Sequence, residues 1–404
     1  MKKREKEVKF RHKVVIVVFK ILLWPAIKIK YRFKYKRYKY LKNKGPYIIL
    51  SNHTVAMDPI LMSFGFPFHL YYIASEQIFN LGLLSKLLVY LVNPISKSKD
   101  QSDIGTIRKA RKIVNEGGSI GVYPEGNVTY DGNAVSINDS IVKLIRLLNI
   151  DVIIYTTKGL YFSDPRWSVY RKKGKSSGHI VKTITKAEYD ELDNDELLEL
   201  IKSYLEVNAY DDQKEKLVKY KGKNIAKGLE RLVFMDLNTN EPFVTYTNKN
   251  ELRSKVSDFK LVYDEYGYVT NEKGEVKTLI EINDEVKMSY YNYYKNTDKK
   301  LLHEEEVTIE LTTKKEKSNK GKSVVKLFKN KVILMYDGIE KTILFDEMIS
   351  ISIQGKKKII INGLENTYLI TLNLDSSPYK YLLTYQIYKG EEKDDITSIR
   401  QLGL

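Results

Sequence analysis

Between residues 46 and 207, short apolar runs alternate with longer segments whose apolar residues have helical spacing. The short runs have the length and the β-branched content of buried strands, and they lie at 46–50, 68–74, 119–123, 151–157 and 179–184. The helical segments lie at 59–63, 77–92, 103–115 and 186–207. Strands that alternate with helices indicate βαβ units. We therefore expect an α/β domain of residues 46–212, with a mostly parallel sheet flanked by helices.

The pattern changes after Asp211. Tyr and Thr become frequent, and the apolar runs shorten and alternate with polar residues, which indicates a β-rich region. The segment 313–323 has the composition of an exposed loop or hairpin tip, and it would divide this region into residues 213–323 and 324–404. We expect the first part to be a β-rich linker or a degenerate ribbon-like region. The second part resembles, at the level of pattern only, the small barrels of PH or GRAM domains.

The first 45 residues form a basic and hydrophobic arm. They hold 17 Lys or Arg against Glu5 and Glu7, so they carry nearly all of the net charge of +17. Inside the arm lies a 14-residue apolar stretch, Val14 to Ile27, which Lys20 interrupts and in which Pro25 limits the helix. A membrane-spanning helix needs about 20 apolar residues. We therefore expect an anchor that lies in the plane of the membrane.

In this anchor the apolar side chains enter the lipid and the lysines reach anionic lipids. The inserted residues would be Phe19, Leu22, Leu23 and Trp24. A signal peptide and a plain core helix are the alternatives. No small-residue cleavage site follows the stretch, and the dense positive charge after it opposes export. We expect a monotopic or peripheral protein at the cytoplasmic face of a membrane.

Composition excludes several kinds of chemistry. The chain of 404 residues contains no cysteine, which excludes disulfides, cysteine nucleophiles and thiolate metal sites. Five histidines make a His-rich metal site unexpected, so we predict no metal. We also expect no nucleic acid partner, because the basic residues are interleaved with the apolar stretch and no nucleic-acid motif appears. The length predicts two or three domains.

A polar constellation follows the first predicted strand, in SNHTVAMDPI, residues 51–60. Asp58 precedes Pro59, so we expect it to be extended and to cap the helix that begins at Pro59. The loop can fold His53 back against the carboxylate of Asp58. One imidazole nitrogen would then donate to Asp58, and the other could take a proton from an alcohol. Taken alone, this spacing more often belongs to a helix cap and a polar loop residue.

Two further segments favour the chemical interpretation. In YPEGN, residues 123–127, a strand ends with Glu125 and Gly126, where open α/β sheets bind ligands and where glycine lets backbone N–H groups approach a phosphate. In NPISKSK, residues 93–99, Lys97 could neutralise that phosphate. An anion would repel Glu125, so we assign it to a hydroxyl or to backbone N–H groups. An ordinary turn and a solvated lysine are the alternatives.

In this order, the three segments resemble the 1-acylglycerol-3-phosphate acyltransferase family, whose signature is an N-H-x4-D block, a later basic block and an F-P-E-G-T block. Asn52, His53 and Asp58 match the first block, and Pro124, Glu125 and Gly126 match the third. Lys97 lies where the family has arginine. The resemblance covers residues 45–210. It implies transfer of an acyl chain from acyl-CoA or acyl carrier protein to the hydroxyl of a lysophospholipid, without a cofactor.

The resemblance also implies residue roles, with His53 as the general base and Asp58 as the group that orients it. The implied substrate-binding residues are Asn52, Lys97, Glu125, Gly126 and Asn127. Asn127 replaces the threonine of the third block, and the basic residue expected after it is absent from 128–132. The acceptor therefore need not be 1-acylglycerol-3-phosphate itself. A membrane-bound lipid-binding protein that has lost activity is the alternative, and the retained His53 and Asp58 favour the enzyme.

Overall fold

The computed structural model describes residues 6–75, 79, 83–97, 104–313 and 317–391. These residues form two compact units. The first contains the chain up to Ser163 together with Lys173–Lys219, and the second contains Asp164–Lys172 together with the chain from Tyr220 onwards. Residue 103, where the helix over 103–115 was expected to begin, lies outside the described residues.

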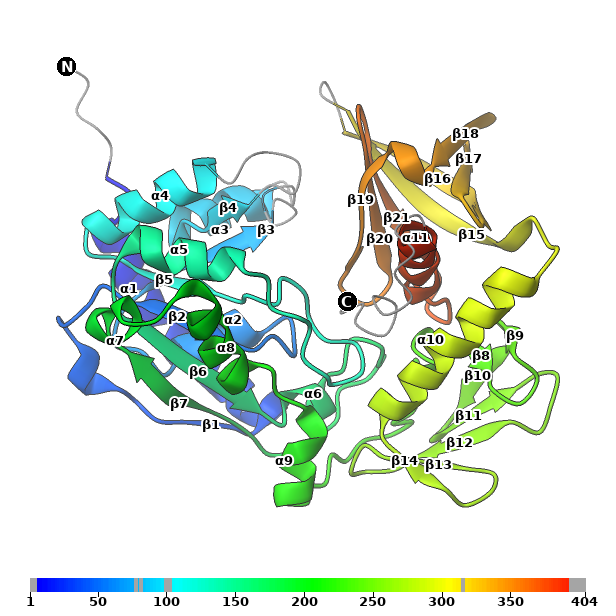
Figure 1. The fold of residues 1–404 in the computed structure, drawn as a ribbon, viewed down its shortest axis with the longest axis horizontal. Coiled ribbons are helices and arrows are strands. Elements are labelled where there is room, and N and C mark those ends of the chain that lie inside the picture. The colour runs from blue at the N-terminus through cyan, green and yellow to red at the C-terminus, as the bar shows by residue number, and fades with distance from the viewer. Residues whose placement is uncertain (1–5, 76–78, 80–82, 98–103, 314–316, 392–404) are drawn as a thin grey trace. The chain divides into compact units, whose positions relative to one another are not determined.

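A seven-stranded sheet in the order β1-β7-β6-β2-β5-β3-β4 organises the first unit (Figure 1). The five neighbouring strands β6, β2, β5, β3 and β4 are parallel to one another. Strand β7 is antiparallel to β6, and β1 pairs with β7 at the edge of the sheet. The predicted α/β class with a mostly parallel sheet is confirmed. The strands are β1 Phe33–Tyr35, β2 Ile48–Ser51, β3 Leu70–Ser75, β4 Ile95–Lys97, β5 Ser119–Val122, β6 Val152–Lys158 and β7 Ser176–Ile184.

Helices cover both faces of this sheet, which explains why its strands are apolar without alternation. Ile48 and Leu50 of β2 face α4, α5 and α8, whereas Ile49 faces the side of α2. The helices of the first unit are α1 Phe10–Tyr31, α2 Asp58–Ser63, α3 Leu83–Val92, α4 Ile104–Asn115, α5 Ser140–Leu148, α6 Leu160–Ser163, α7 Lys186–Asp190, α8 Asn194–Leu205 and α9 Ala209–Glu215. The sequence had not predicted α5.

The helix expected over 186–207 is divided into α7 and α8. Thr185 caps α7, because its hydroxyl accepts a hydrogen bond from the N–H of Glu188. Asp193 caps α8 in the same way, through the N–H groups of Asp195 and Glu196. Each cap supplies acceptors for N–H groups that a helix start leaves unpaired, so two helices replace one.

Helix α1 differs from the expected anchor. It continues through Pro25, where the helix was expected to be limited, because residues on both sides of the proline pack on the unit. Trp24 lies 4.9 Å from Tyr35 and 5.4 Å from Phe64, measured between ring centroids, so its expected insertion into lipid is wrong. Lys20 also turns inward and donates to the carbonyl of Phe66, and burial lowers its pKa to about 8.

The other side of α1 is apolar and exposed. The exposed side chains recur three or four residues apart and so form one stripe, made of Phe10, Val14, Val17, Val18, Ile21, Leu22 and Ile29. Leu22 is exposed as the anchor requires, whereas Leu23 packs against the core. Within the described part of the chain, no helix has the length and apolar character needed to cross a bilayer.

The second unit is β-rich, as predicted, and also contains the unpredicted helix α10 Leu279–Asn296. A seven-stranded antiparallel sheet has the order β18-β17-β16-β15-β21-β20-β19 and is followed by α11 Tyr379–Glu391 (Figure 1). Its strands are β15 Leu301–Thr312, β16 Lys317–Phe328, β17 Lys331–Tyr336, β18 Ile339–Leu344, β19 Met348–Gln354, β20 Lys358–Gly363 and β21 Thr367–Thr371. The smaller sheets contain β8 Met235–Asp236, β9 Glu241–Pro242, β10 Thr245–Asn248, β11 Glu251–Ser254, β12 Lys260–Tyr263, β13 Val269–Asn271 and β14 Val276–Lys277.

Residues 313–323, expected to be an exposed loop or a hairpin tip, lie at the hairpin of β15 and β16, and most of them belong to a strand. Lys317–Phe328 is strand β16, which pairs with β15 along most of its length. The lysine-rich composition concealed this strand, because exposed lysine side chains are tolerated on a strand while its backbone pairs. The tip of the expected hairpin, 314–316, lies outside the described residues.

Candidate active site

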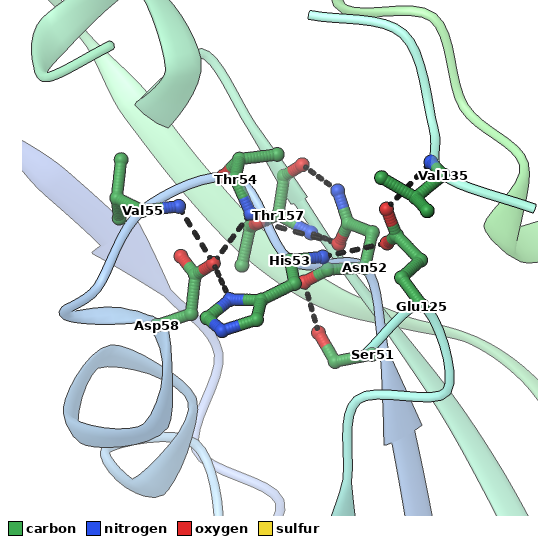
Figure 2. A network of polar contacts seen from close by, with 9 residues as sticks. All are labelled: Ser51, Asn52, His53, Thr54, Val55, Asp58, Glu125, Val135 and Thr157. Carbon is green, nitrogen blue, oxygen red and sulfur yellow. Dashed lines mark hydrogen bonds and ion pairs between the residues drawn. The ribbon is translucent and has the colours of Figure 1, made fainter. Parts of the chain in front are cut away.

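The loop that follows β2 folds back on itself and brings His53 and Asp58 together. Nδ1 of His53 lies 3.0 Å from Oδ2 of Asp58 (Figure 2). The same carboxylate oxygen accepts hydrogen bonds from the backbone N–H groups of Thr54 at 2.6 Å and Val55 at 2.9 Å. The carboxylate is therefore both the partner of the imidazole and the centre around which the loop is wound.

Asp58 is not the N-cap that the sequence predicted. It is the first residue of α2, and its carboxylate points back to the loop rather than to the first N–H groups of the helix. Pro59 has no N–H group, so the start of this helix has one fewer donor to satisfy. The N-cap expectation is wrong because the loop N–H groups of Thr54 and Val55 bind the carboxylate instead.

This geometry assigns the proton on the imidazole. A carboxylate oxygen only accepts, so Nδ1 of His53 donates to Asp58, and Nε2 of the neutral ring keeps its lone pair. Asp58 is fully buried, whereas the side chain of His53 is 18% exposed. The dyad thus has a buried carboxylate and a partly exposed imidazole, and an imidazole oriented in this way can act as a general base.

The ring of Tyr123 supports His53 from one side. Its centroid lies 4.4 Å from that of the imidazole, with 30° between the planes, and the ring of Tyr72 stacks with that of Tyr123 at 6.2 Å between centroids. Burial raises the pKa of the Tyr123 hydroxyl well above its ordinary value, so this hydroxyl stays protonated. Sequence reasoning did not single out Tyr123, although its position directly before the predicted Pro124-Glu125-Gly126 turn was a usable signal.

Glu125 braces the backbone of the same loop. Its Oε1 accepts from the N–H of His53 at 2.7 Å and its Oε2 accepts from the N–H of Val135 at 3.0 Å (Figure 2). These are backbone N–H groups, one of the two kinds of partner that the sequence suggested. Burial raises the pKa of Glu125 to about 8. The carboxyl group therefore joins the turn after β5 to the residue that carries the imidazole.

Asn52 fixes the loop on the other side. Its Oδ1 accepts from the N–H of Thr157 at 2.8 Å, and its Nδ2 donates to the carbonyl of Thr157 at 3.0 Å (Figure 2). The side-chain amide thus continues the hydrogen bonding between β2 and β6 one residue beyond the end of β2. In the structure Asn52 connects strands, and its expected contact with substrate stays a prediction.

The remaining predicted residues lie along the same edge of the sheet. Gly126 has φ +72°, a conformation that favours glycine, and its N–H donates to the carbonyl of Tyr123 in the turn after β5. Asn127 follows it and is half-buried. Lys97 is exposed at the end of β4, three strands from β2, which is about 14 Å at the usual strand spacing. The structure therefore gathers all predicted residues except Lys97 around the dyad.

Comparisons with known proteins support the resemblance to acyltransferases. Residues 32–157 match the model of the acyltransferase family. The chain is 23% identical over 188 residues to a putative 1-acyl-sn-glycerol-3-phosphate acyltransferase of Caenorhabditis elegans, which covers 44% of this chain and 67% of that protein. It is 23% identical over 128 residues to a 1-acyl-sn-glycerol-3-phosphate acyltransferase of Borreliella burgdorferi, which covers 31% of this chain and 51% of that protein.

The crystal structure of the 1-acyl-sn-glycerophosphate acyltransferase of Thermotoga maritima aligns with 51% of this chain and 81% of its own, at 18% identity and a TM-score of 0.42. The chain spans about two thirds of the Caenorhabditis relative and about half of the Borreliella relative. The matched residues 32–157 include His53, Asp58 and Glu125. The predicted resemblance to the 1-acylglycerol-3-phosphate acyltransferase family is confirmed, because residues 32–157 match the acyltransferase model and both curated relatives carry that name.

Proposed function

We propose that this protein transfers a fatty acyl chain from acyl-CoA or acyl carrier protein to the hydroxyl of a lysophospholipid, 1-acyl-glycerol-3-phosphate or a similar acceptor, at a membrane surface. One observation carries the proposal. The buried carboxylate of Asp58 holds Nδ1 of His53, so that Nε2 keeps its lone pair for a proton, on a side chain that is 18% exposed.

In the proposed reaction, Nε2 of His53 takes the proton of the acceptor hydroxyl as the hydroxyl oxygen attacks the thioester carbonyl. The new carbon–oxygen bond forms, the carbon–sulfur bond breaks, and the imidazolium returns its proton to the departing thiolate. A positioned base of this kind contributes about 10² to 10⁴ in rate. Asp58 stabilises the imidazolium between the two proton transfers, and no nucleophile from the protein is needed.

The bonds around the dyad support this role, because a base must be held in place to act efficiently. Glu125 holds the backbone N–H of His53, and the preceding residue, Asn52, is fixed by its hydrogen bond with Thr157. Tyr123 restricts the ring itself. In this proposal Glu125 and Asn52 position the base, while Gly126 and Asn127 face the substrate and Lys97 neutralises an acceptor phosphate from the far side.

The exposed stripe of α1 supports action at the membrane surface. Leu83 and Leu87 of α3 are exposed to 84% and 52%, and α3 packs beside α1. Apolar side chains on two neighbouring helices, with lysines around them, fit the boundary between headgroups and acyl chains. We propose that these two helices rest on the cytoplasmic face of a membrane with anionic lipids.

Mass spectrometry of products tests the proposal directly. The purified protein would be offered a panel of lysophospholipids, each with acyl-CoA or with acyl carrier protein. The proposal expects a diacyl product with at least one donor and acceptor pair, and no product with His53→Ala. If no pair yields a product from the wild-type protein in the presence of vesicles, the chain is a lipid-binding protein without this activity.

A further inference from the structure

A cavity with basic side chains in its walls lies at the opposite edge of the sheet from the dyad. Its volume is about 730 Å³, within the range of cavities that hold small ligands, roughly 300 to 1,000 Å³. The segment before α1, the start of α1 and the end of α3 form its walls. Asn93, in its wall, precedes β4, whereas His53 follows the carboxyl end of β2, which runs in the same direction.

Helix α1 connects the two places. It begins beside the cavity and ends at Tyr31, directly before β1, whose first residue Phe33 pairs with Ser176 at the start of β7. That point lies at the edge of the sheet where β6 ends. With 22 residues, α1 is about 33 Å long. A ligand in the cavity is therefore far from the reacting atoms and is not the substrate.

The walls of the cavity favour an anion. Four basic side chains line it, from Lys6, Lys9, Arg11 and Lys86, against the single carboxylate of Glu7. That carboxylate is occupied, because Nζ of Lys112 lies 3.0 Å from one of its oxygens and Nδ2 of Asn93 donates to the other at 3.0 Å. The cavity thus keeps an excess of positive charge, which suits a phosphate group.

The basic walls are held by hydrogen bonds to the rest of the unit. Nε of Arg11 donates to the carbonyl of Tyr90 at 2.8 Å, and its guanidinium lies 4.1 Å from the centroid of the Tyr90 ring. The N–H of Val8 donates to Glu116, which precedes β5. The segment before α1 is therefore fixed to the sheet, and its lysines do not belong to a loose tail.

Apolar side chains line or adjoin the same place. Tyr90 lines the cavity and is 57% exposed, and Phe10 and Leu83, which are close in sequence to lining residues, are 80% and 84% exposed. A ligand with a charged phosphate and apolar chains matches a basic cavity with an apolar surround, whereas a free phosphate uses only the first of these features. Because the proposed membrane surface runs along α1 and α3, the cavity lies at the level of the headgroups.

We propose that this cavity binds the headgroup phosphate of an anionic phospholipid that is not a substrate, and so fixes the start of α1 at the membrane. The inference rests on the membrane-surface part of the proposed function. The test of this inference measures lipid binding without turnover, so a negative result would leave the acyl-transfer proposal unaffected. If the protein transfers no acyl chain, lipid binding can still be measured.

Two double variants with the same loss of charge test the site. Lys6→Gln with Lys86→Gln removes two cations from the cavity, and Lys28→Gln with Lys30→Gln removes two exposed cations from the far end of α1. Calorimetry with soluble dihexanoyl-phosphatidylglycerol should give saturable binding to the wild-type protein and to the Lys28 and Lys30 variant. The affinity of the cavity variant for this lipid should be lower by about tenfold or more, as expected for lost charge-assisted contacts.

Three results would overturn the inference. The first is no binding of the short-chain lipid by the wild-type protein, and the second is an equal loss in both double variants, which would mean diffuse attraction of charges. The third is binding of glycerol 3-phosphate as tight as that of the lipid, which would identify a site for soluble phosphate esters. Dihexanoyl-phosphatidylcholine, whose headgroup is zwitterionic and has no net charge, serves as the control and should not bind.

Discussion

The imidazole of His53 lies against the ring of Tyr123, with 4.4 Å between the ring centroids. This contact gives Tyr123 a positioning role that depends on the ring and not on the hydroxyl. We expect Tyr123→Phe to keep most of the acyl-transfer rate. Tyr123→Leu should lower kcat by about tenfold or more with little change in KM, because the base loses its fixed orientation. Equal activity of the leucine and phenylalanine variants would show that the ring contact is unimportant.

Glu125 should make stability depend on pH. Because burial raises its pKa to about 8 in the folded state, the folded protein holds a proton that the unfolded chain has lost above its ordinary value near 4.5. The contribution of Glu125 to the free energy of unfolding is fully present below the ordinary pKa and is lost as pH rises through the pKa of the folded state. One such proton changes the free energy of unfolding by about 1.4 kcal/mol per pH unit between these values.

Denaturant unfolding at several pH values between 5 and 8 measures this effect. Glu125→Gln has no proton to lose, so the decline of stability with rising pH should become shallower than in the wild-type protein. The amide keeps one oxygen that accepts from the N–H of His53 or of Val135. An unchanged slope in the variant would show that Glu125 is ionised throughout this range.

The exposed stripe of α1 should be needed for membrane binding but not for folding. Ile21 and Leu22 are exposed to 68% and 69%, so Ile21→Asp with Leu22→Asp should leave the unfolding temperature nearly unchanged and release the protein from anionic vesicles in co-sedimentation. Deletion of the arm is a poorer test, because Ile27 and Tyr31 belong to the core. Leu147→Asp, at an exposed leucine of α5, is the matched control and should keep vesicle binding.

The segment 164–172 should stabilise the second unit. Trp167 is fully buried there, 5.3 Å from Tyr263 between ring centroids, and Nη1 of Arg231 donates to its carbonyl. Trp167→Ala should lower the free energy of unfolding of that unit by about 3 to 5 kcal/mol. Tyr170→Ala, in the same segment and half exposed, should change it by about 0.5 kcal/mol or less. Similar losses for both variants in urea unfolding would contradict this assignment.

The sequence was most informative where neighbouring residues determine the geometry. The apolar runs of β2 and β6 predicted the sheet, and the six residues from His53 to Asp58 were enough to suggest their pairing. The loop that joins His53 to Asp58 is short, so few loop conformations would keep the two side chains apart.

Tertiary contacts account for most of what the sequence did not predict. The carboxylate of Asp58 binds N–H groups of its own loop, so the expected helix cap is missing. Helix α1 continues beyond Pro25 because Ile27 and Tyr31 pack in the core. Trp167 is buried in the core of the second unit, although the segments on both sides of 164–172 belong to the first unit. None of these contacts has a signal in the local pattern.

The central claim is that His53 is a general base oriented by Asp58. Asp58→Asn keeps an oxygen that accepts from the loop N–H groups of Thr54 and Val55, so the fold should be retained while the charge that stabilises the imidazolium is lost. We expect acyl transfer by the purified, vesicle-bound protein to fall by about 10² to 10⁴ in both His53→Ala and Asp58→Asn. Circular dichroism should show both variants folded. The most direct measurement is the rate of product formation by His53→Ala in that folded state: a rate close to the wild-type value would contradict the mechanism.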